Sequence, residues 1–234
     1  YDGTNFHGWQ MQNHDRTVQG EIEAGIKDLN QGNRVVLHGS GRTDSGVHAL
    51  GQIAHFDLKT DLAEEVIKNA INAKTDRAIV IHKCEEVNPD FHARFQAQKR
   101  YYKYKIWYGN TAIYRNYMWP VNRKLDKDLL IKCAEIIKGR HDFTGFCRSS
   151  DEADHKICHI YDSTWKITKK TLIYKICGNR FLHSMVRMLT GTMIEVARGR
   201  YQFSDFKNIL ENEHSDKYPF TAPAKGLYLE KVEY

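Results

Sequence analysis

The residues best suited to chemistry in this sequence surround Asp44, in the glycine-rich stretch GRTDSGVHA at 41–49. Arg42 stands two positions earlier, and in an extended segment residues i and i+2 project to the same side. The two side chains could therefore share a pocket, where the cation would keep the carboxylate ionised and able to act as a nucleophile. The alternative is an ordinary glycine-rich turn with a surface Asp–Arg pair, which is common and contributes little.

A second candidate is the basic and aromatic run KRYYKYKIWY at 99–108. Alternation predicts a strand with Tyr102 and Tyr104 on one face and Lys103 and Lys105 on the other. Such a strand can bind RNA, with lysines on phosphates and rings stacked on exposed bases. A sheet strand with a tyrosine core face and a solvated lysine face fits the pattern equally well.

Arg187 is a third candidate because of its place in a predicted helix over about 184–198. Met185, Met188 and Met193 form part of an apolar stripe at helical spacing, which favours a core role for the methionines. Arg187 lies off that stripe near the helix start, where a cation gains nothing from the helix dipole. This position favours a neighbouring anion, either a carboxylate or an RNA phosphate, although a solvated arginine also fits.

The elements around Asp44 are predicted to alternate between strands and helices. The run 35–37 predicts a strand leading into the loop, and 52–58 and 78–87 predict two more strands. Helices are predicted over about 17–30, capped by Thr17, and over about 61–72, with Leu62 and Val66 among its inward residues. This order is that of a ferredoxin-like unit.

The second half is predicted to be α+β as well. A helix is expected over about 126–138, a hairpin at 157–167 and 172–178, a short helix capped by Ser204, and a last strand ending near Tyr234. Segments 114–122 and 142–156 are expected to be irregular, the second as a surface excursion. Short connections favour antiparallel strands.

Composition narrows the class of protein. The chain has 234 residues, 41% of them hydrophobic, which suits one large domain or two small ones. A net charge of +6 is compatible with a polyanionic partner such as nucleic acid. The five cysteines are an odd number and lack a CxxC pair, so a reducing compartment is expected. A loose group of cysteines and histidines matches no zinc spacing: Cys147, His155, Cys158 and His159. No apolar run is long enough to cross a bilayer and no signal peptide is visible; because the chain starts at Tyr1, we expect further residues before it.

Five motifs, in order, resemble those of the tRNA pseudouridine synthase A family. They are the opening YDGTNFHGWQ at 1–10, the nonapeptide at 41–49, FHARF with RYY at 91–102, FLHSMVR at 181–187 and TAPAKGLYL at 221–229. Together they span the chain. Ser45 departs from the family's alanine, one small residue for another.

The resemblance implies an RNA-modifying isomerase that converts uridine to pseudouridine in tRNA, at positions 38–40 of the anticodon stem-loop, with no cofactor and no metal. It implies an α+β fold of two ferredoxin-like or RRM-like halves, 1–95 and 96–234, that share a continuous, mainly antiparallel sheet with helices packed on it. The first half would carry the catalytic Asp loop and the second would complete the cleft. A cytoplasmic homodimer is expected.

The resemblance also assigns roles by position. Asp44 would be the nucleophile on a flipped-out uridine, Arg42 would fill the space left by the base or hold a phosphate, Tyr102 would stack on the uracil, and Arg187 would pair with Asp44. Nearby cations are candidates for RNA phosphates: Arg94, Lys99, Arg100, Lys103, Lys105 and Arg180. The rival interpretations are a paralogue acting on ribosomal RNA and a catalytically silent RNA-binding protein on the same scaffold. A carboxylate-based hydrolase lacks a clear second acid.

Overall fold

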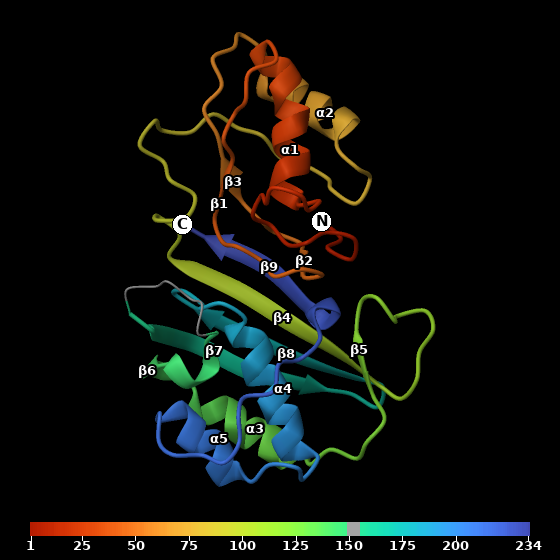
Figure 1. Cartoon of the computed structure of the whole chain (residues 1–234), viewed down its shortest axis with the longest axis vertical. Coiled ribbons are helices and arrows are strands. Elements are labelled where there is room, and N and C mark those ends of the chain that lie inside the picture. The colour runs from red at the N-terminus through yellow and green to blue at the C-terminus, as the bar shows by residue number, and fades with distance from the viewer. Residues whose placement is uncertain (149–154) are drawn as a thin grey trace. The chain divides into compact units, whose positions relative to one another are not determined.

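The computed structural model describes residues 1–148 and 155–234 (Figure 1). The chain forms two compact units. The first comprises Tyr1–Gln98 together with Tyr234, and the second comprises Lys99–Glu233. The predicted functional division into 1–95 and 96–234, and the predicted sharing of one continuous sheet, stay predictions.

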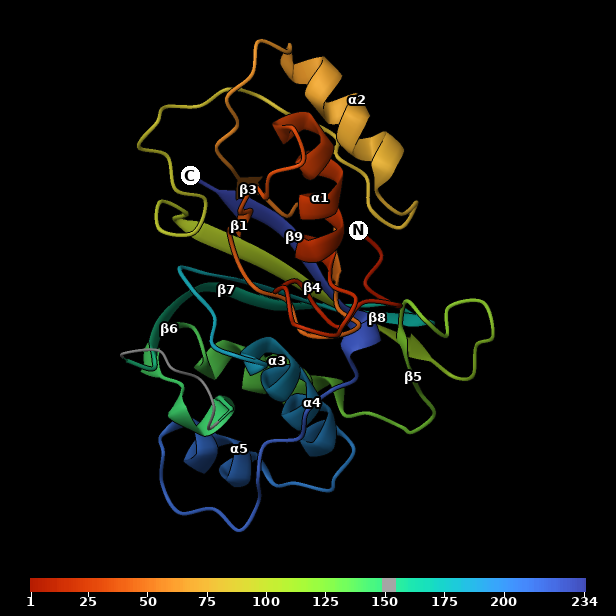
Figure 2. The same ribbon diagram turned by 45° about the horizontal axis from the view of Figure 1, so that its top comes forward.

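Two helices lie side by side in the first unit, α1 (Val18–Lys27) and α2 (Glu64–Lys74) (Figure 2). Thr17 caps α1 as predicted, because its side chain accepts the amide hydrogen of Gly20. A short 3-10 turn at Asp28–Asn30 follows, and the chain then turns away through Gly32 at φ +81°. The helical run therefore ends at Asn30, as predicted, although Gln31 already has positive φ, at +54°, before Gly32.

The core of the first unit lies between these helices and the neighbouring loops. Ile67 and Ile71 are the buried residues of α2, whereas Leu62 and Val66 are 43% and 49% exposed. The predicted inward face of α2 was therefore wrong for Leu62 and Val66. The helix begins only at Glu64, which leaves Leu62 outside it, and turning the isoleucines inward directs Val66 outward. The other buried members of this core are Phe6, Trp9, Val18, Ile22, Ile26, Val35, Leu37 and Ile79.

Strands in the first unit are much shorter than predicted. They are β1 (His38–Gly39), β2 (His48–Ala49) and β3 (Ala54–His55), and β1 pairs antiparallel with β3. The segment 78–87 forms no strand. The side chain of Asn72 takes the place of a ladder there, since its amide accepts from the N–H and donates to the carbonyl of Ile81, at 2.7 and 2.9 Å. At Ile81 the backbone groups of the predicted strand 78–87 are therefore satisfied by a side chain instead of a neighbouring strand.

The second unit contains an extended antiparallel sheet with the order β9-β4-β8-β7-β6. Its strands are β4 (Lys99–Tyr108), β6 (Gly139–Asp142), β7 (Ile157–Ile167), β8 (Thr171–Gly178) and β9 (Leu227–Glu233). A short strand, β5 (Trp119–Val121), pairs in parallel with β4 inside a segment predicted to be a loop. The predicted mainly antiparallel α+β class is confirmed.

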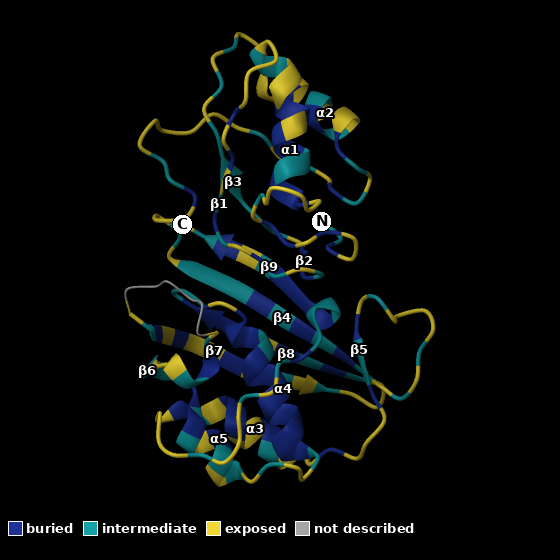
Figure 3. Cartoon of the chain, viewed as in Figure 1, coloured by how far each residue is buried: buried dark blue, intermediate teal, exposed yellow. Residues whose placement is uncertain are grey.

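Helices α3 (Lys127–Ile136), α4 (Met185–Ala197) and α5 (Phe203–Leu210) gather on one side of this sheet (Figure 1). The predicted methionine stripe is confirmed, since α4 is buried along almost its whole length (Figure 3). The cap of α5 differs from the prediction. Gln202, not Ser204, is the cap, in a reciprocal pair of hydrogen bonds with Asp205.

The segment 142–156 was predicted to be a polar surface excursion, and this is wrong for its first part. Phe143 and Phe146 are fully buried, and Phe146 packs against Phe206 of α5 with ring centroids 5.2 Å apart. Two phenylalanines within four residues anchor the segment despite its polar composition. Residues 149–154 lie outside the described residues. None of the helices that the structure describes has the length and apolar character needed to cross a bilayer.

Candidate active site

The loop that carries Asp44 runs between β1 and β2 and is held by the opening segment of the chain. Trp9 donates its backbone N–H to the carbonyl oxygen of Thr43 at 3.1 Å. On the other side of Asp44, the carbonyl oxygen of Phe6 accepts from the Gly46 N–H at 3.2 Å and from the Ser45 hydroxyl at 3.3 Å. The loop is therefore bonded to the opening motif immediately before and after the half-buried Asp44.

Two glycines make this close approach possible. Gly8 has φ +93°, and a Cβ there would lie 2.6 Å from the carbonyl oxygen of Thr43. A Cβ on Gly3 would lie 2.0 Å from the carbonyl oxygen of Val47. Both distances are too short for any other residue, so the opening motif needs glycine where it crosses the Asp44 loop.

Side chains hold the loop at both ends. The Tyr1 hydroxyl lies 2.7 Å from the Thr43 hydroxyl, and Gly3 donates its N–H to Nδ1 of the buried His48 at 3.1 Å. Gln52 bridges the start of the loop, because it accepts from the Ser40 hydroxyl at 2.7 Å and donates to the Gly41 carbonyl at 2.8 Å. Sequence reasoning missed Gln52, Tyr1 and His48 as supports of the loop.

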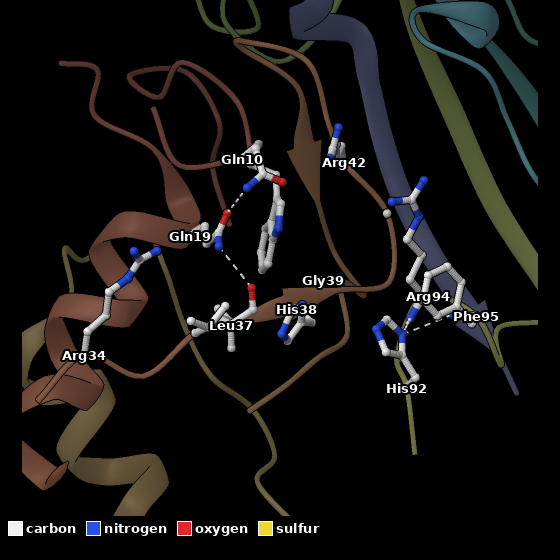
Figure 4. Close-up of a pocket in the computed structure, with 13 residues that line it drawn as sticks. Gln10, Gln19, Arg34, Leu37, His38, Gly39, Arg42, His92, Arg94 and Phe95 are labelled. Carbon is white, nitrogen blue, oxygen red and sulfur yellow. Dashed lines mark hydrogen bonds between the residues drawn. The ribbon is translucent and has the colours of Figure 1, made fainter. Parts of the chain in front are cut away.

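Arg42 is exposed and lies on the wall of a cavity of about 430 Å³ within the first unit (Figure 4). The described residues that line this cavity include Arg42 but not Asp44. Arg94, one of the predicted phosphate contacts, also lines this cavity, beside Phe95 (Figure 4). The structure thus brings two of the predicted cations, Arg42 and Arg94, around one hollow.

A buried carboxylate fixes the back of this cavity. Glu23 of α1 is 5% exposed, and its Oε1 accepts from the N–H of Leu37 at 3.0 Å and from Nε2 of Gln19 at 2.8 Å. Its Oε2 receives Nε of Arg34 at 3.1 Å. Gln19 in turn accepts from Nε2 of Gln10 at 2.8 Å. This network joins α1 to the segment that leads into β1, and nothing in the sequence pattern had indicated it.

Tyr102 lies on β4 in the second unit, on the buried face as the alternation predicts. It is 7% exposed, and its ring meets that of Phe181 edge to face with centroids 5.2 Å apart. On the same face, Tyr104 donates its hydroxyl to the carbonyl of Pro223 at 2.6 Å. Burial raises the pKa of Tyr104 well above its ordinary value, with the charge of Arg187 acting in the opposite direction.

Arg187 lies in the first turn of α4 and is tied to the closing motif of the chain. Its Nε donates to the carbonyl of Ala222 at 2.8 Å, while the N–H of Ala222 donates to the Arg187 carbonyl at 3.1 Å. Gly191 permits this contact, because a Cβ there would lie 2.1 Å from the carbonyl oxygen of Phe220. The closing motif therefore helps to orient the guanidinium of Arg187, which stands at the start of α4.

The other predicted phosphate contacts in the second unit already have protein neighbours. Lys103 bonds Glu230 at 2.8 Å, and Lys99 approaches Glu233 at 3.8 Å. Nζ of Lys105 lies 4.3 Å from the ring centroid of Tyr228, and burial, followed by the charge of Lys103, lowers the pKa of Lys105. Arg100 donates to the carbonyl of Asn179 at 2.7 Å, and the N–H of the half-buried Arg180 donates to the Asn179 side chain.

Asp44, Arg42 and Arg94 thus belong to the first unit. The second unit carries Tyr102, Arg187 and the other predicted cations, Lys99, Arg100, Lys103, Lys105 and Arg180. Their assembly into one catalytic site, and the role of each residue in it, stay predictions.

Known proteins match this chain along its whole length. A family model described as tRNA pseudouridine synthase matches residues 1–96 and 133–234. Proteins named tRNA pseudouridine synthase A from Anoxybacillus flavithermus and Acetivibrio thermocellus are 38% and 39% identical to it, over all of this chain and 96% of each relative. The protein of that name from Ehrlichia ruminantium is 38% identical over the same shares. Because the family model matches most of the chain and these relatives are 38–39% identical over all of it, the chain belongs to the tRNA pseudouridine synthase family.

Proposed function

We propose that this protein isomerises uridine to pseudouridine in the anticodon stem-loop of tRNA, at positions 38–40, with Asp44 as the nucleophile. The observation that carries the proposal is the loop 41–49, which is bonded on both sides of Asp44 to the opening motif. The relatives named tRNA pseudouridine synthase A, which match all of this chain and 96% of their own length, support it. A loop backbone held on both sides of Asp44 helps to preorganise its carboxylate for attack on a bound substrate.

The reaction needs no co-reactant because it rearranges bonds within one nucleotide. The bond between N1 and C1′ breaks, a bond between C5 and C1′ forms, C5 loses a proton and N1 gains one. The target base first leaves its stack, which costs a few kcal/mol. Asp44 attacks either C1′ or C6 of the uracil, or helps to remove a proton at C1′.

The other residues have supporting roles in the proposal. Arg42, exposed at the cavity wall, takes the space left by the base or holds a phosphate. Tyr102, in an apolar setting against Phe181, stacks on the uracil and helps to remove the C5 proton. Arg187, aimed by its bond to Ala222, keeps Asp44 ionised. Arg94, Lys99, Arg100, Lys103, Lys105 and Arg180 contact backbone phosphates. The protein acts as a homodimer in the cytoplasm.

The test uses unmodified tRNA transcripts that carry a single uridine at position 38, 39 or 40. After incubation with the protein in a chelating buffer, pseudouridine is mapped by carbodiimide block and primer extension, with Asp44→Asn alongside. We expect a stop at the uridine that the variant abolishes, while the variant binds tRNA with nearly unchanged affinity. Turnover by Asp44→Asn would overturn the assignment of the nucleophile, and no stop with the wild type would overturn the substrate.

A further inference from the structure

We propose that the cavity beside Arg42 is a binding site for one unpaired nucleotide of the substrate RNA, next to the target uridine. The phosphate would lie among the arginines of the cavity and the base would stack on Phe95. The inference rests on the proposed function, because it takes the ligand to be part of the same RNA.

The charge of the cavity selects an anion. Arg34, Arg42 and Arg94 line it together with His38 and His92, and the described lining residues include no aspartate or glutamate (Figure 4). The buried Glu23 lies behind the wall and engages Arg34 only through Nε, and the Arg34 side chain remains 59% exposed. One terminal nitrogen of Arg34 meets only the thioether sulfur of Met11, a weak acceptor at 3.9 Å, so the guanidinium can still donate terminal N–H groups to a phosphate.

An exposed aromatic ring marks the place for a base. The side chain of Phe95 is 76% exposed, whereas Phe6, in the core of the same unit, is 2% exposed. Its position is fixed by a turn, in which Nδ1 of His92 accepts from the N–H groups of Arg94 and Phe95 at 3.1 and 3.4 Å. The ring centroids of His92 and Phe95 lie 4.2 Å apart, and Cζ of Arg94 lies 5.8 Å from the Phe95 ring centroid. Aromatic and guanidinium planes of this kind stack on unpaired bases.

The location ties the cavity to the substrate. Arg42 is on its wall, and Asp44 follows two positions later in the same bonded loop. Bases inside a double helix cannot reach an exposed ring, so the nucleotide must come from a loop. A volume of about 430 Å³ is of the size that small-molecule sites usually have, and one nucleotide fits this class. The site is therefore expected to read the flank of the target uridine.

The test is a binding cycle between protein and RNA, in an Asp44→Asn background that prevents turnover. The RNAs are anticodon stem-loops with the target uridine at position 38, at the end of the loop, either intact or with a single abasic nucleotide at one of the unpaired loop positions next to it. Phe95→Ala should weaken binding of the intact RNA about 5- to 150-fold, the range for one stacked base. One abasic position should weaken binding to the Phe95 protein by a similar factor and have no further effect on Phe95→Ala.

Two control variants separate stacking from general effects. Phe95→Tyr keeps a ring and should bind as the parent does. Tyr218→Ala removes an aromatic residue that is 83% exposed in the second unit and should leave affinity unchanged. The proposal is overturned if Phe95→Ala binds as tightly as the parent, or if every abasic RNA loses the same factor with both proteins.

The outcome is independent of the catalytic test. Coupling between Phe95 and one abasic position, without pseudouridine formation by the wild type, would support the nucleotide site and overturn the proposed activity. Pseudouridine formation without such coupling would support the proposed activity and overturn the nucleotide site.

Discussion

The backbone N–H of Trp9 donates to the carbonyl oxygen of Thr43, the residue directly before Asp44, at 3.1 Å. Gly8, one position before Trp9, passes so close to the same carbonyl that a Cβ would lie 2.6 Å from it. The opening segment of the chain and the loop with the carboxylate are therefore hydrogen-bonded to each other. This contact explains why the opening motif has glycine at position 8.

Gly8→Ala should displace the Asp44 loop. The substitution adds a left-handed backbone penalty of about 1–2 kcal/mol and a clash with Thr43, so we expect a lower melting temperature and at least a tenfold loss of kcat. Gly32→Ala is the matched control, because Gly32 also has positive φ, at +81°, but a Cβ there meets nothing within 4 Å. Equal activity loss in both variants would mean that backbone strain alone, and not the contact with the loop, is responsible.

Gln52→Ala should loosen the start of the loop without touching RNA. It removes the bonds to the Ser40 hydroxyl and the Gly41 carbonyl, each contributing about 1 kcal/mol. We expect kcat to fall about tenfold while the Kd for tRNA changes less than threefold, as measured by single-turnover kinetics and filter binding. Asn208→Ala, which also removes a side-chain bond to a backbone carbonyl, at His214 in the second unit, should leave kcat unchanged.

Replacing Lys103 and Lys105 together by alanine should weaken tRNA binding and flatten its salt dependence. Removing a lysine from a phosphate reduces the slope of log K against log salt by about 1. The control is Lys138→Ala with Lys207→Ala, which removes the same charge from lysines paired with Glu135 and Glu211. An unchanged slope in the first pair would assign those lysines to their protein partners, Glu230 and Tyr228.

The pH dependence of stability should carry a contribution from His55. Desolvation, followed by the charges of His92 and His38, lowers the pKa of His55 below its ordinary value of 6.5. The unfolded state therefore binds more protons between the folded pKa and 6.5, so stability is lost as pH falls through that window. His55→Asn retains an acceptor for the N–H of Ala93 but does not titrate. Denaturant unfolding from pH 7.5 to 5 should show a smaller loss for this variant, and parallel curves would contradict the prediction.

Much of the second unit could be predicted from the sequence because its elements are long and regular. Strand β4 begins and ends at the predicted residues, Lys99 and Tyr108. Its alternating positions pair with β8 on one side and with β9 and then β5 on the other. The structure of segment 78–87 in the first unit could not be predicted in this way, because the backbone groups of Ile81 bond to the side chain of Asn72. No periodicity in a sequence reports a bond of this kind.

The candidate site divides in the same way. Glycine spacing indicated the loop at 41–49, and the helix pattern singled out Arg187. The supports Gln52 and Glu23 were not predicted, because each acts through a single side chain on a backbone group distant in the sequence. Phe95 stands inside the FHARF motif, yet only its exposure of 76% separates it from a core phenylalanine.

The Asn72 side chain that replaces a strand pairing also sets how the first unit opens. Within segment 78–87, Ile81 is held by two bonds to the Asn72 side chain and by no continuous strand ladder, whereas β4 is paired on both sides. In amide hydrogen–deuterium exchange, Ile81 should therefore exchange long before Tyr104 of β4. We therefore expect the first unit, which carries Asp44, to open locally before the second unit, and the sheet of the second unit to unfold last.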